Sequence, residues 1–294
     1  YDSEGTKLWE SDSAHSWNFV AHGVELDDEG NVYISGRDLS KNGYMSKYSP
    51  DGTHIWTEPI SSGMAYNLDV QNGTVYTVSQ SSSSAIIDKF NLKGEKQDTF
   101  MYTPSNGKDA HVRDIDLDSN GNIYISGFTD YSWFIVKFDS SGTHVWTEEY
   151  GQSGNNRATT MKVDSNGDIY VGGLKEAENT KVSWRLAKYD SEGNLLWEDI
   201  SEGAGRDRVF DIDVDAQDNV YAVGDGLVST SDGDKNGWRI AKYSPDGTEH
   251  WVKHGYSSSE AHGVGIDSQG TVYVAGNYSG PEDKDWGIIT YSGE

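Results

Sequence analysis

The chain has 294 residues, with 23 Lys and Arg against 48 Asp and Glu and no Cys, so its formal net charge is −25 at pH 7. This charge repels phosphate backbones and anionic lipid surfaces, which argues against nucleic acid and membrane partners and favours cations. The missing Cys excludes disulfides, thiolate nucleophiles and Cys-based zinc sites. No apolar run approaches the roughly 18 residues of a membrane span.

A short apolar motif with a central Tyr recurs six times along the chain. Its tyrosines are Tyr33, Tyr76, Tyr124, Tyr170, Tyr221 and Tyr273. They are separated by 43, 48, 46, 51 and 52 residues. This period is typical of the four-stranded blades of a β-propeller.

Each unit contains the pattern of four short strands. The first strand alternates apolar and polar residues, as in 211–214, and ends in a Gly-containing turn such as 118–122. The second strand carries the Tyr. The third resembles 184–189, and the fourth ends in Trp or Phe after a turn of the kind at 244–248. No segment has the period of a helix.

We therefore predict an all-β fold: a six-bladed β-propeller of four-stranded antiparallel blades, forming one domain over residues 1–294. The units span about residues 22–56, 66–100, 113–146, 159–197, 210–251 and 262–294. The last unit stops after its third strand, whereas residues 1–9 have the pattern of an orphan fourth strand. We expect this N-terminal strand to pair with the C-terminal blade and close the ring, which hides both edges. A cut from a longer array and pairing with a neighbouring subunit stay open.

The units resemble the SBBP-type bacterial β-propeller repeat. The resemblance rests on residues 154–173 and 206–224, which match a Gly-Asn-Asp-Arg-Ala-like loop followed by Val-Asp-Ser-x-Gly-Asn-Val-Tyr-Val-x-Gly. That family is named for seven blades, whereas six units are counted in this chain. The resemblance implies an extracellular or cell-envelope protein and transfers no catalytic residue. Tyr1 in place of an initiator Met fits a processed chain or an excised domain.

Tryptophans fall into two columns of the repeat. Fourth strands end in Trp9, Trp56, Trp146, Trp197 and Trp251, and third strands open with Trp133, Trp184, Trp238 and Trp286. Packing between blades explains the first column. Packing between blades is also the favoured explanation of the second column. This column, however, lies where third strands begin, at the face where propellers usually bind ligands, and Trp stacks well on sugars, so a ligand-binding role stays open. Trp17 belongs to neither column, and we expect it to contact a partner.

The connections between second and third strands are longest in units four to six. Variable loops carry function in a repeat ring, so the sequence places a ligand site there. It is bordered by Trp184, Trp238 and Trp286, with Arg208 and His262 within reach. His22 holds the same position as His262 in the blade that ring closure makes adjacent. The acidic residues of this region are Asp225, Asp232, Asp234, Asp283 and Asp285, and they favour a cationic, hydroxylated or calcium-bridged ligand.

First strands surround the axis of a propeller, so their polar residues line a narrow tunnel. The acidic members of this set are Glu25, Asp69, Asp114, Asp116, Asp211 and Asp213. Crowded carboxylates either raise their pKa or hold a cation such as Ca²⁺; a wet polar channel explains the same residues. The turn at 116–121 begins like a calcium loop but lacks its terminal acidic ligand, and a hairpin turn explains the same letters.

The leading hypothesis is a non-catalytic extracellular module for recognition or scaffolding, which binds a glycan or a protein through its loop face. A carbohydrate-active or metal-dependent hydrolase or lyase of propeller type is the first alternative, because acidic residues are abundant and their separation is not visible in a sequence. The second is a structural subunit of a surface layer or filament, which associates through the terminal strand. Ca²⁺ is the one cofactor that the pattern suggests.

Overall fold

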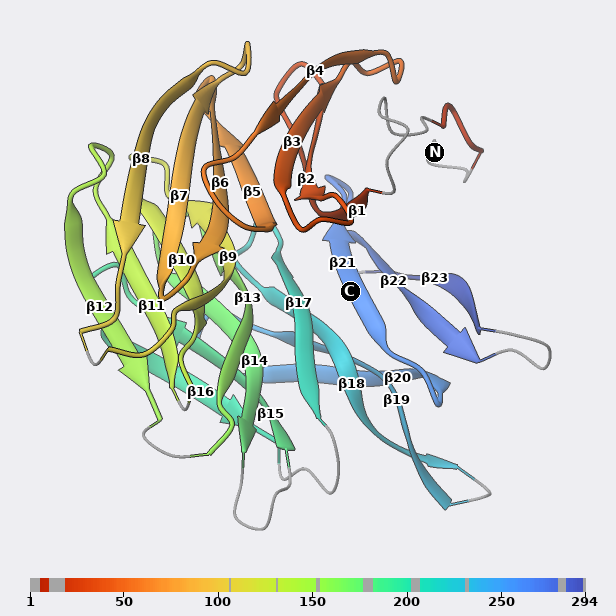
Figure 1. Ribbon diagram of the computed structural model, residues 1–294. Coiled ribbons are helices and arrows are strands. Elements are labelled where there is room, and N and C mark those ends of the chain that lie inside the picture. Colours follow the sequence, from red (N-terminus) through yellow and green to blue (C-terminus); the bar gives the residue numbers. More distant parts are fainter. Residues whose placement is uncertain are drawn as a thin grey trace. The chain divides into compact units, whose positions relative to one another are not determined.

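The computed structural model describes residues 6–10, 19–105, 107–130, 132–151, 154–176, 182–201, 207–230, 233–279 and 284–292. Within these ranges all regular structure is β, and the strands form six antiparallel sheets (Figure 1). The described residues include no helix with the length and apolarity needed to span a membrane. The fold is a six-bladed β-propeller, as the repeat predicts.

Each sheet is one blade built from consecutive strands. Blade 1 contains β1 (Val20–Leu26), β2 (Val32–Arg37), β3 (Gly43–Tyr48) and β4 (His54–Pro59). Blade 2 contains β5 (Ala65–Gln71), β6 (Thr74–Ser81), β7 (Ser84–Asn91) and β8 (Lys96–Tyr102). Blade 3 contains β9 (His111–Leu117), β10 (Ile123–Phe128), β11 (Trp133–Phe138) and β12 (His144–Tyr150).

The second half of the chain repeats the pattern. Blade 4 contains β13 (Arg157–Val163), β14 (Ile169–Glu176), β15 (Val182–Tyr189) and β16 (Leu195–Ile200). Blade 5 contains β17 (Arg208–Val214), β18 (Val220–Thr230), β19 (Gly233–Tyr243) and β20 (Glu249–Ser257). Blade 6 contains β21 (Ala261–Ile266), β22 (Thr271–Ser279) and β23 (Lys284–Ser292).

The chain divides into two compact units. Unit 1 comprises residues 1–125 and 138–143, and unit 2 comprises residues 126–137 and 144–294. In unit 1 the first strands β1, β5 and β9 lie against one another in that order, and in unit 2 the first strands β13, β17 and β21 do the same. The expectation of one domain over residues 1–294 stays a prediction.

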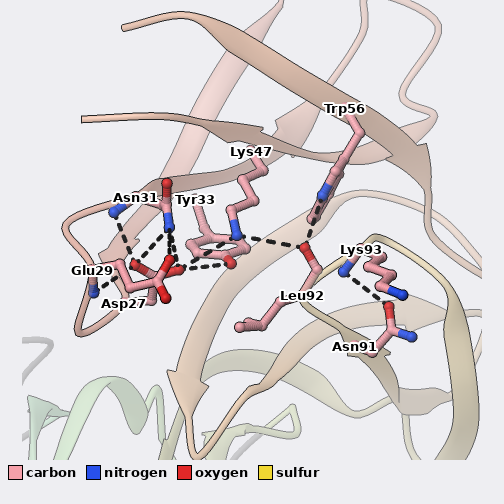
Figure 2. A network of polar contacts seen from close by, with 9 residues as sticks. All are labelled: Asp27, Glu29, Asn31, Tyr33, Lys47, Trp56, Asn91, Leu92 and Lys93. Atoms are coloured by element: carbon pink, nitrogen blue, oxygen red, sulfur yellow. Dashed lines mark hydrogen bonds and ion pairs between the residues drawn. The ribbon is translucent and has the colours of Figure 1, made fainter. Parts of the chain in front are cut away.

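In blade 1 the Asp, Asn, Tyr and Lys of the repeat form one polar network. In blade 1 the carboxylate of Asp27 accepts hydrogen bonds from the backbone amide of Asn31 at 2.9 Å and from the Tyr33 hydroxyl at 3.0 Å (Figure 2). Lys47 of the third strand lies 3.4 Å from the same carboxylate and 4.9 Å from the centroid of the Tyr33 ring. The Asp therefore ties the first hairpin turn to the second and third strands.

Parts of this network recur in blades 3 to 6, whereas blade 2 has Gln71 in place of the turn Asp. The second-strand Tyr donates to the turn Asp in blade 3 (Tyr124 to Asp118), blade 5 (Tyr221 to Asp215) and blade 6 (Tyr273 to Asp267). In blade 4 Lys188 is buried and lies 2.9 Å from Asp164 and 3.0 Å from Asp168. The repeat signature is thus a structural device, because buried charges persist only when they are paired.

The fourth-strand tryptophans link consecutive blades, as their column predicts. Trp56 donates its indole N–H to the backbone carbonyl of Leu92 at 3.1 Å, in the third turn of blade 2 (Figure 2). Trp197 donates in the same way to Pro245 at 3.0 Å. Each ring also packs edge-on against the second-strand Tyr of its own blade, as Trp56 does against Tyr33 at 5.9 Å between centroids. The aromatic columns supply burial that aliphatic residues supply in most cores.

Trp9 makes the same contact from the N-terminal segment. Its indole donates to the carbonyl of Pro50 at 3.0 Å, and its ring stacks on Tyr48 with 6.5 Å between centroids. Among the described residues, however, 6–10 form no strand and the sixth sheet has three strands. Trp9 therefore occupies the position of a fourth-strand Trp, while the predicted strand pairing that closes the ring stays a prediction.

One predicted loop is instead a long ribbon. The sequence predicts a variable loop over residues 225–237, between the second and third strands of blade 5. These residues are instead mostly in β18 and β19. The register of the two strands runs from Val220 opposite Tyr243 to Thr230 opposite Gly233. The two strands project as a two-stranded ribbon (Figure 1). Backbone pairing satisfies the N–H and C=O groups that a loop would leave to water.

Candidate functional site

Arg208 anchors a polar cluster at the start of blade 5. It is the first residue of β17 and is paired in register with Asp225 of β18. Its guanidinium lies 2.7 Å from the Asp225 carboxylate and 2.8 Å from Glu260, which precedes β21. Burial raises the pKa of Asp225, against the opposing effect of Arg208. The bonds to both carboxylates raise the pKa of Arg208, so one cation is held between two acids.

Glu260 extends this cluster into blade 6. Its backbone amide donates to the Asn277 side-chain oxygen at 3.0 Å, while the Asn277 amide nitrogen lies 3.0 Å from Nε2 of His262. With Asn277 as donor, Nε2 of His262 is the acceptor and the ring proton is on Nδ1. The Glu260 carboxylate lies 3.6 Å from the same Nε2. Sequence reasoning missed Glu260 and Asn277, because they stand in no repeated column of acids.

Three aromatic rings border the cluster. The His262 ring lies 5.1 Å from Phe210 and 6.0 Å from Trp286, measured between centroids. Arg208 covers Phe210 at 4.7 Å. Trp286 is 75% exposed, whereas the other third-strand tryptophans are at most 1% exposed. An exposed indole beside an imidazole, a carboxylate and an amide offers one flat apolar face and several hydrogen-bonding groups, which suits a hydroxylated ring.

Two predicted border residues are not available to a ligand. Trp184 and Trp238 are fully buried. Arg239 covers the Trp184 ring at 4.7 Å, and Trp238 donates its indole N–H to the Asn277 carbonyl at 2.8 Å. This corrects their prediction as ligand contacts: they pack between blades, as the packing interpretation of the column holds. Trp17 lies outside the described residues.

His22 of β1 contacts residues of β5 within unit 1. Its Nδ1 lies 2.6 Å from the carbonyl oxygen of Ala65, and its ring stacks on Tyr66 at 6.2 Å between centroids. His22 therefore has a packing role at the start of blades 1 and 2. Its predicted role beside His262 stays a prediction.

Acidic residues of the first strands bind backbone amides. In blade 5 Asp211 accepts from its own neighbour Ile212 and, through its other oxygen, from Val264 of β21, both at 2.9 Å. Asp213 accepts in the same way from Val214 and from Ile266 of β21, again at 2.9 Å. Each carboxylate thus joins two adjacent first strands of unit 2.

The acids of unit 1 follow the same local pattern. Asp69, Asp114 and Asp116 each accept from the backbone amide of the following residue, and Asn67 donates to Asp114. Glu25 is opposite Tyr33 in the β1–β2 register. In the described part of the chain no group of three or more His, Asp or Glu side chains is arranged to hold a metal ion. The tunnel cation therefore stays a prediction, and the described residues offer no ligand set for it.

The turn that resembles a calcium loop is a hairpin turn. One oxygen of Asp118 accepts from the backbone amides of Asn120 and Asn122, both at 2.9 Å. The other accepts from the Asn122 side chain at 2.7 Å and from the Tyr124 hydroxyl at 3.1 Å. Gly121 has a φ of 76°, which a residue with a side chain rarely adopts. These hydrogen bonds occupy the carboxylate oxygens of Asp118 that a calcium ion would need as ligands.

Of the predicted loop acids, Asp225 alone has a described side chain; Asp232 and Asp283 lie outside the described residues. Two small cavities also occur away from the predicted site. One, of about 260 Å³, is lined by Asp27, Asp28, Glu29, Val70, Gln71, Asn72, Gly73 and Leu92. The other, of about 160 Å³, is lined by Trp133, Ile135, Glu148, Glu149, Tyr150, Tyr189, Gly193 and Leu195. None of the predicted ligand residues lines either cavity.

No family model matches the chain, and no curated protein does. Solved structures with similar folds include a protein of unknown function from Bacteroides caccae, with 16% identity, a TM-score of 0.55 and coverage of 84% of this chain and 85% of that one. A provisionally named 6-phosphogluconolactonase from Bacteroides uniformis has 11% identity and a TM-score of 0.62, with 92% and 84% covered.

The WD40 domain of Pan2 from Neurospora crassa is also similar, with 11% identity, a TM-score of 0.57, and 86% of this chain and 74% of that one covered. At these identities the likeness shows the propeller fold alone. The resemblance to SBBP-type repeats therefore stays a prediction.

Proposed function

We propose that the chain is a non-catalytic recognition module that binds a glycan through the surface formed by Trp286, His262, Glu260 and Asn277. The observation that carries the proposal is the 75% exposure of the Trp286 indole, 6.0 Å from the His262 ring. A sugar ring stacked on the indole has its hydroxyls within reach of the polar cluster, and such stacking is a common use of exposed Trp. The composition favours an extracellular or cell-envelope location for this module.

The alternative of a hydrolase has weaker support. Asp225 and Glu260 are the two carboxylates of the cluster, and both bond to Arg208. A general acid needs a carboxyl group poised toward the substrate, whereas these two carboxylates are engaged by the same guanidinium. A ligand that binds with high affinity and remains uncleaved supports the module; release of a shortened sugar chain supports the enzyme.

The test is a screen of immobilised glycans with the wild-type protein, followed by titration of each hit against Trp286→Ala. We expect the substitution to weaken binding at least tenfold, because truncation of a Trp at the centre of a binding surface costs about 2 kcal/mol or more. Ile288→Ser is the matched control, since Ile288 is 71% exposed on the same face of β23. Equal losses in both variants would mean that the strand, and not the indole, is recognised.

Acrylamide quenching of Trp286 fluorescence tests whether the indole is accessible to a ligand. An indole covered by another segment, as its counterparts in blades 3 to 5 are, would be quenched weakly. Strong quenching in wild type that is lost in Trp286→Ala supports an open platform. Weak quenching together with no glycan hit would refute the proposed site and favour a packing role for Trp286.

A further inference from the structure

The third strands carry a repeated contact between Trp and Arg. In blade 4 Arg185 follows Trp184 and is fully buried. Its guanidinium lies 4.3 Å from the ring centroid of Trp133 in blade 3 and 3.5 Å from that of Tyr150. Arg239, the matching residue of blade 5, covers Trp184 of blade 4 at 4.7 Å. In both cases a guanidinium from one blade covers the third-strand Trp of the blade before it.

Blade 6 breaks this pattern at Gly287. By sequence Gly287 follows Trp286 as Arg185 follows Trp184, so its side chain would face Trp238 of blade 5. Trp238 is instead flanked by Tyr256, whose ring lies edge-on at 5.3 Å between centroids, much as Tyr150 lies against Trp133 at 6.2 Å. The aromatic pair is retained, the arginine that covers it elsewhere is replaced by hydrogen, and Tyr278 stacks on one face of Tyr256.

Two tyrosine rings lie close to Gly287. A Cβ atom added at Gly287 would lie 3.3 Å from Tyr256 and 3.3 Å from Tyr278. These two tyrosines stack at 4.9 Å between centroids, and Tyr256 is 41% exposed. Gly287 and Tyr278 are on the same face of the sheet, because Gly287 is opposite Gly276 in the register. Trp286 is on the other face, so this surface is distinct from the glycan site.

We propose that Tyr256, Tyr278 and Gly287 form a binding site for the guanidinium of an arginine side chain from a partner protein. Aromatic faces attract cations, and guanidinium groups are the commonest partners of such faces. The chain itself shows the same kind of contact, since the guanidinium of Arg185 lies over the rings of Trp133 and Tyr150. The net charge of −25 adds a long-range attraction for a basic partner.

The experiment is a calorimetric or NMR titration with a short peptide that carries one arginine, against the same peptide with citrulline. Citrulline keeps the shape and removes the charge. We expect about fivefold weaker binding of the citrulline peptide, as for a cation over exposed rings. Titration with free arginine amide distinguishes a guanidinium on a partner protein from one on a small molecule. If arginine amide binds as tightly as the peptide, the partner is a small guanidinium compound and a protein partner is refuted. Equal affinity for the arginine and citrulline peptides would overturn the site.

Gly287→Arg tests the assignment by filling the site from within. The new side chain should cover Tyr256, raise the unfolding temperature relative to Gly287→Ala and abolish binding of the arginine peptide. Unchanged peptide binding by folded Gly287→Arg would overturn the proposal. If that variant fails to fold, Tyr256→Leu replaces it. Binding of the arginine peptide that is about fivefold weaker, with unchanged binding of the citrulline peptide, supports the site. Unchanged binding of the arginine peptide refutes the site. Tyr150→Leu is the matched control, because its ring already holds Arg185.

Discussion

The buried pair of Lys188 and Asp164 offers the sharpest test of the repeat network. The side chain of Lys188 is 4% exposed and that of Asp164 is fully buried, and their charged atoms are 2.9 Å apart. Lys188→Met removes the cation and leaves the Asp164 carboxylate buried without its ionic partner. Breaking such a pair costs about 3–5 kcal/mol, because an unpaired buried charge is far from water.

This cost predicts a large fall in thermal stability. A chain of this size loses roughly 2 °C in unfolding temperature for each kcal/mol, so Lys188→Met should unfold about 6–10 °C below wild type. Differential scanning calorimetry measures the shift. Lys242→Met is the graded control, because Lys242 lies 4.0 Å from Asp215 and both side chains are slightly exposed; its shift should be clearly smaller.

A double-mutant cycle isolates the pair itself. Asp164→Asn keeps an oxygen for the amides of Asn166 and Asp168, both bonded at 2.9 Å, and removes the charge. The double variant Asp164→Asn with Lys188→Met should therefore be more stable than Lys188→Met alone, with a coupling of about 1–3 kcal/mol. Additive effects, or a shift below about 2 °C for Lys188→Met, would refute the view that this ion pair holds the blade together.

Three further predictions concern other parts of the fold. Deleting residues 1–10 should lower the unfolding temperature by several degrees, because Trp9 loses its bond to Pro50 and its stack on Tyr48; an unchanged melt would mean that the segment contributes nothing. Asp213→Ala should lower the unfolding temperature equally with and without calcium, because its carboxylate binds two backbone amides; a calcium-dependent loss would instead support the tunnel cation. Hydrogen bonds from Ser141 and Thr143 lower the pKa of Asp139, so its stabilisation is present above the unfolded pKa of about 3.9 and is lost as the pH falls through the lower folded value. Asp139→Asn should flatten the acid limb of a plot of unfolding temperature against pH, and an unchanged limb would contradict this.

The fold was predictable because its determinants are periodic. The Tyr column recurs six times, and the Gly turn after the first strand recurs five times, with Asp218 at the positive-φ position in blade 5. Local preference thus agrees with the global architecture along the repeat. The ribbon of β18 and β19 was missed, because residues 225–237 are rich in Gly, Ser and Asp and resemble a loop by composition. Pairing of the two strands overrides that preference.

The candidate site was predictable only in part. Arg208 and His262 were singled out and do lie in one cluster, because first strands of adjacent blades begin at the same edge. Glu260 and Asn277, which join them, were missed since nothing in one sequence shows that they meet. The burial of Trp184 and Trp238 could not be predicted either. The same residue, Trp, stands at this position of the repeat whether the next blade covers the indole or leaves it exposed.

The acidic composition also takes a different meaning once its partners are known. Turn aspartates such as Asp118 bind backbone amides and the second-strand Tyr. First-strand aspartates such as Asp213 join adjacent strands through two amides. A carboxylate that accepts bonds from amides is stabilised without any cation, since charge-assisted bonds are roughly twice as strong as neutral ones. An Asp-based turn recurs in five of the six blades, and Asp-based first-strand contacts recur in blades 2, 3 and 5. Many of the carboxylates therefore have structural partners other than a cation, and a cation-binding role requires a suitable geometry at a particular place and does not follow from the charge of the whole chain.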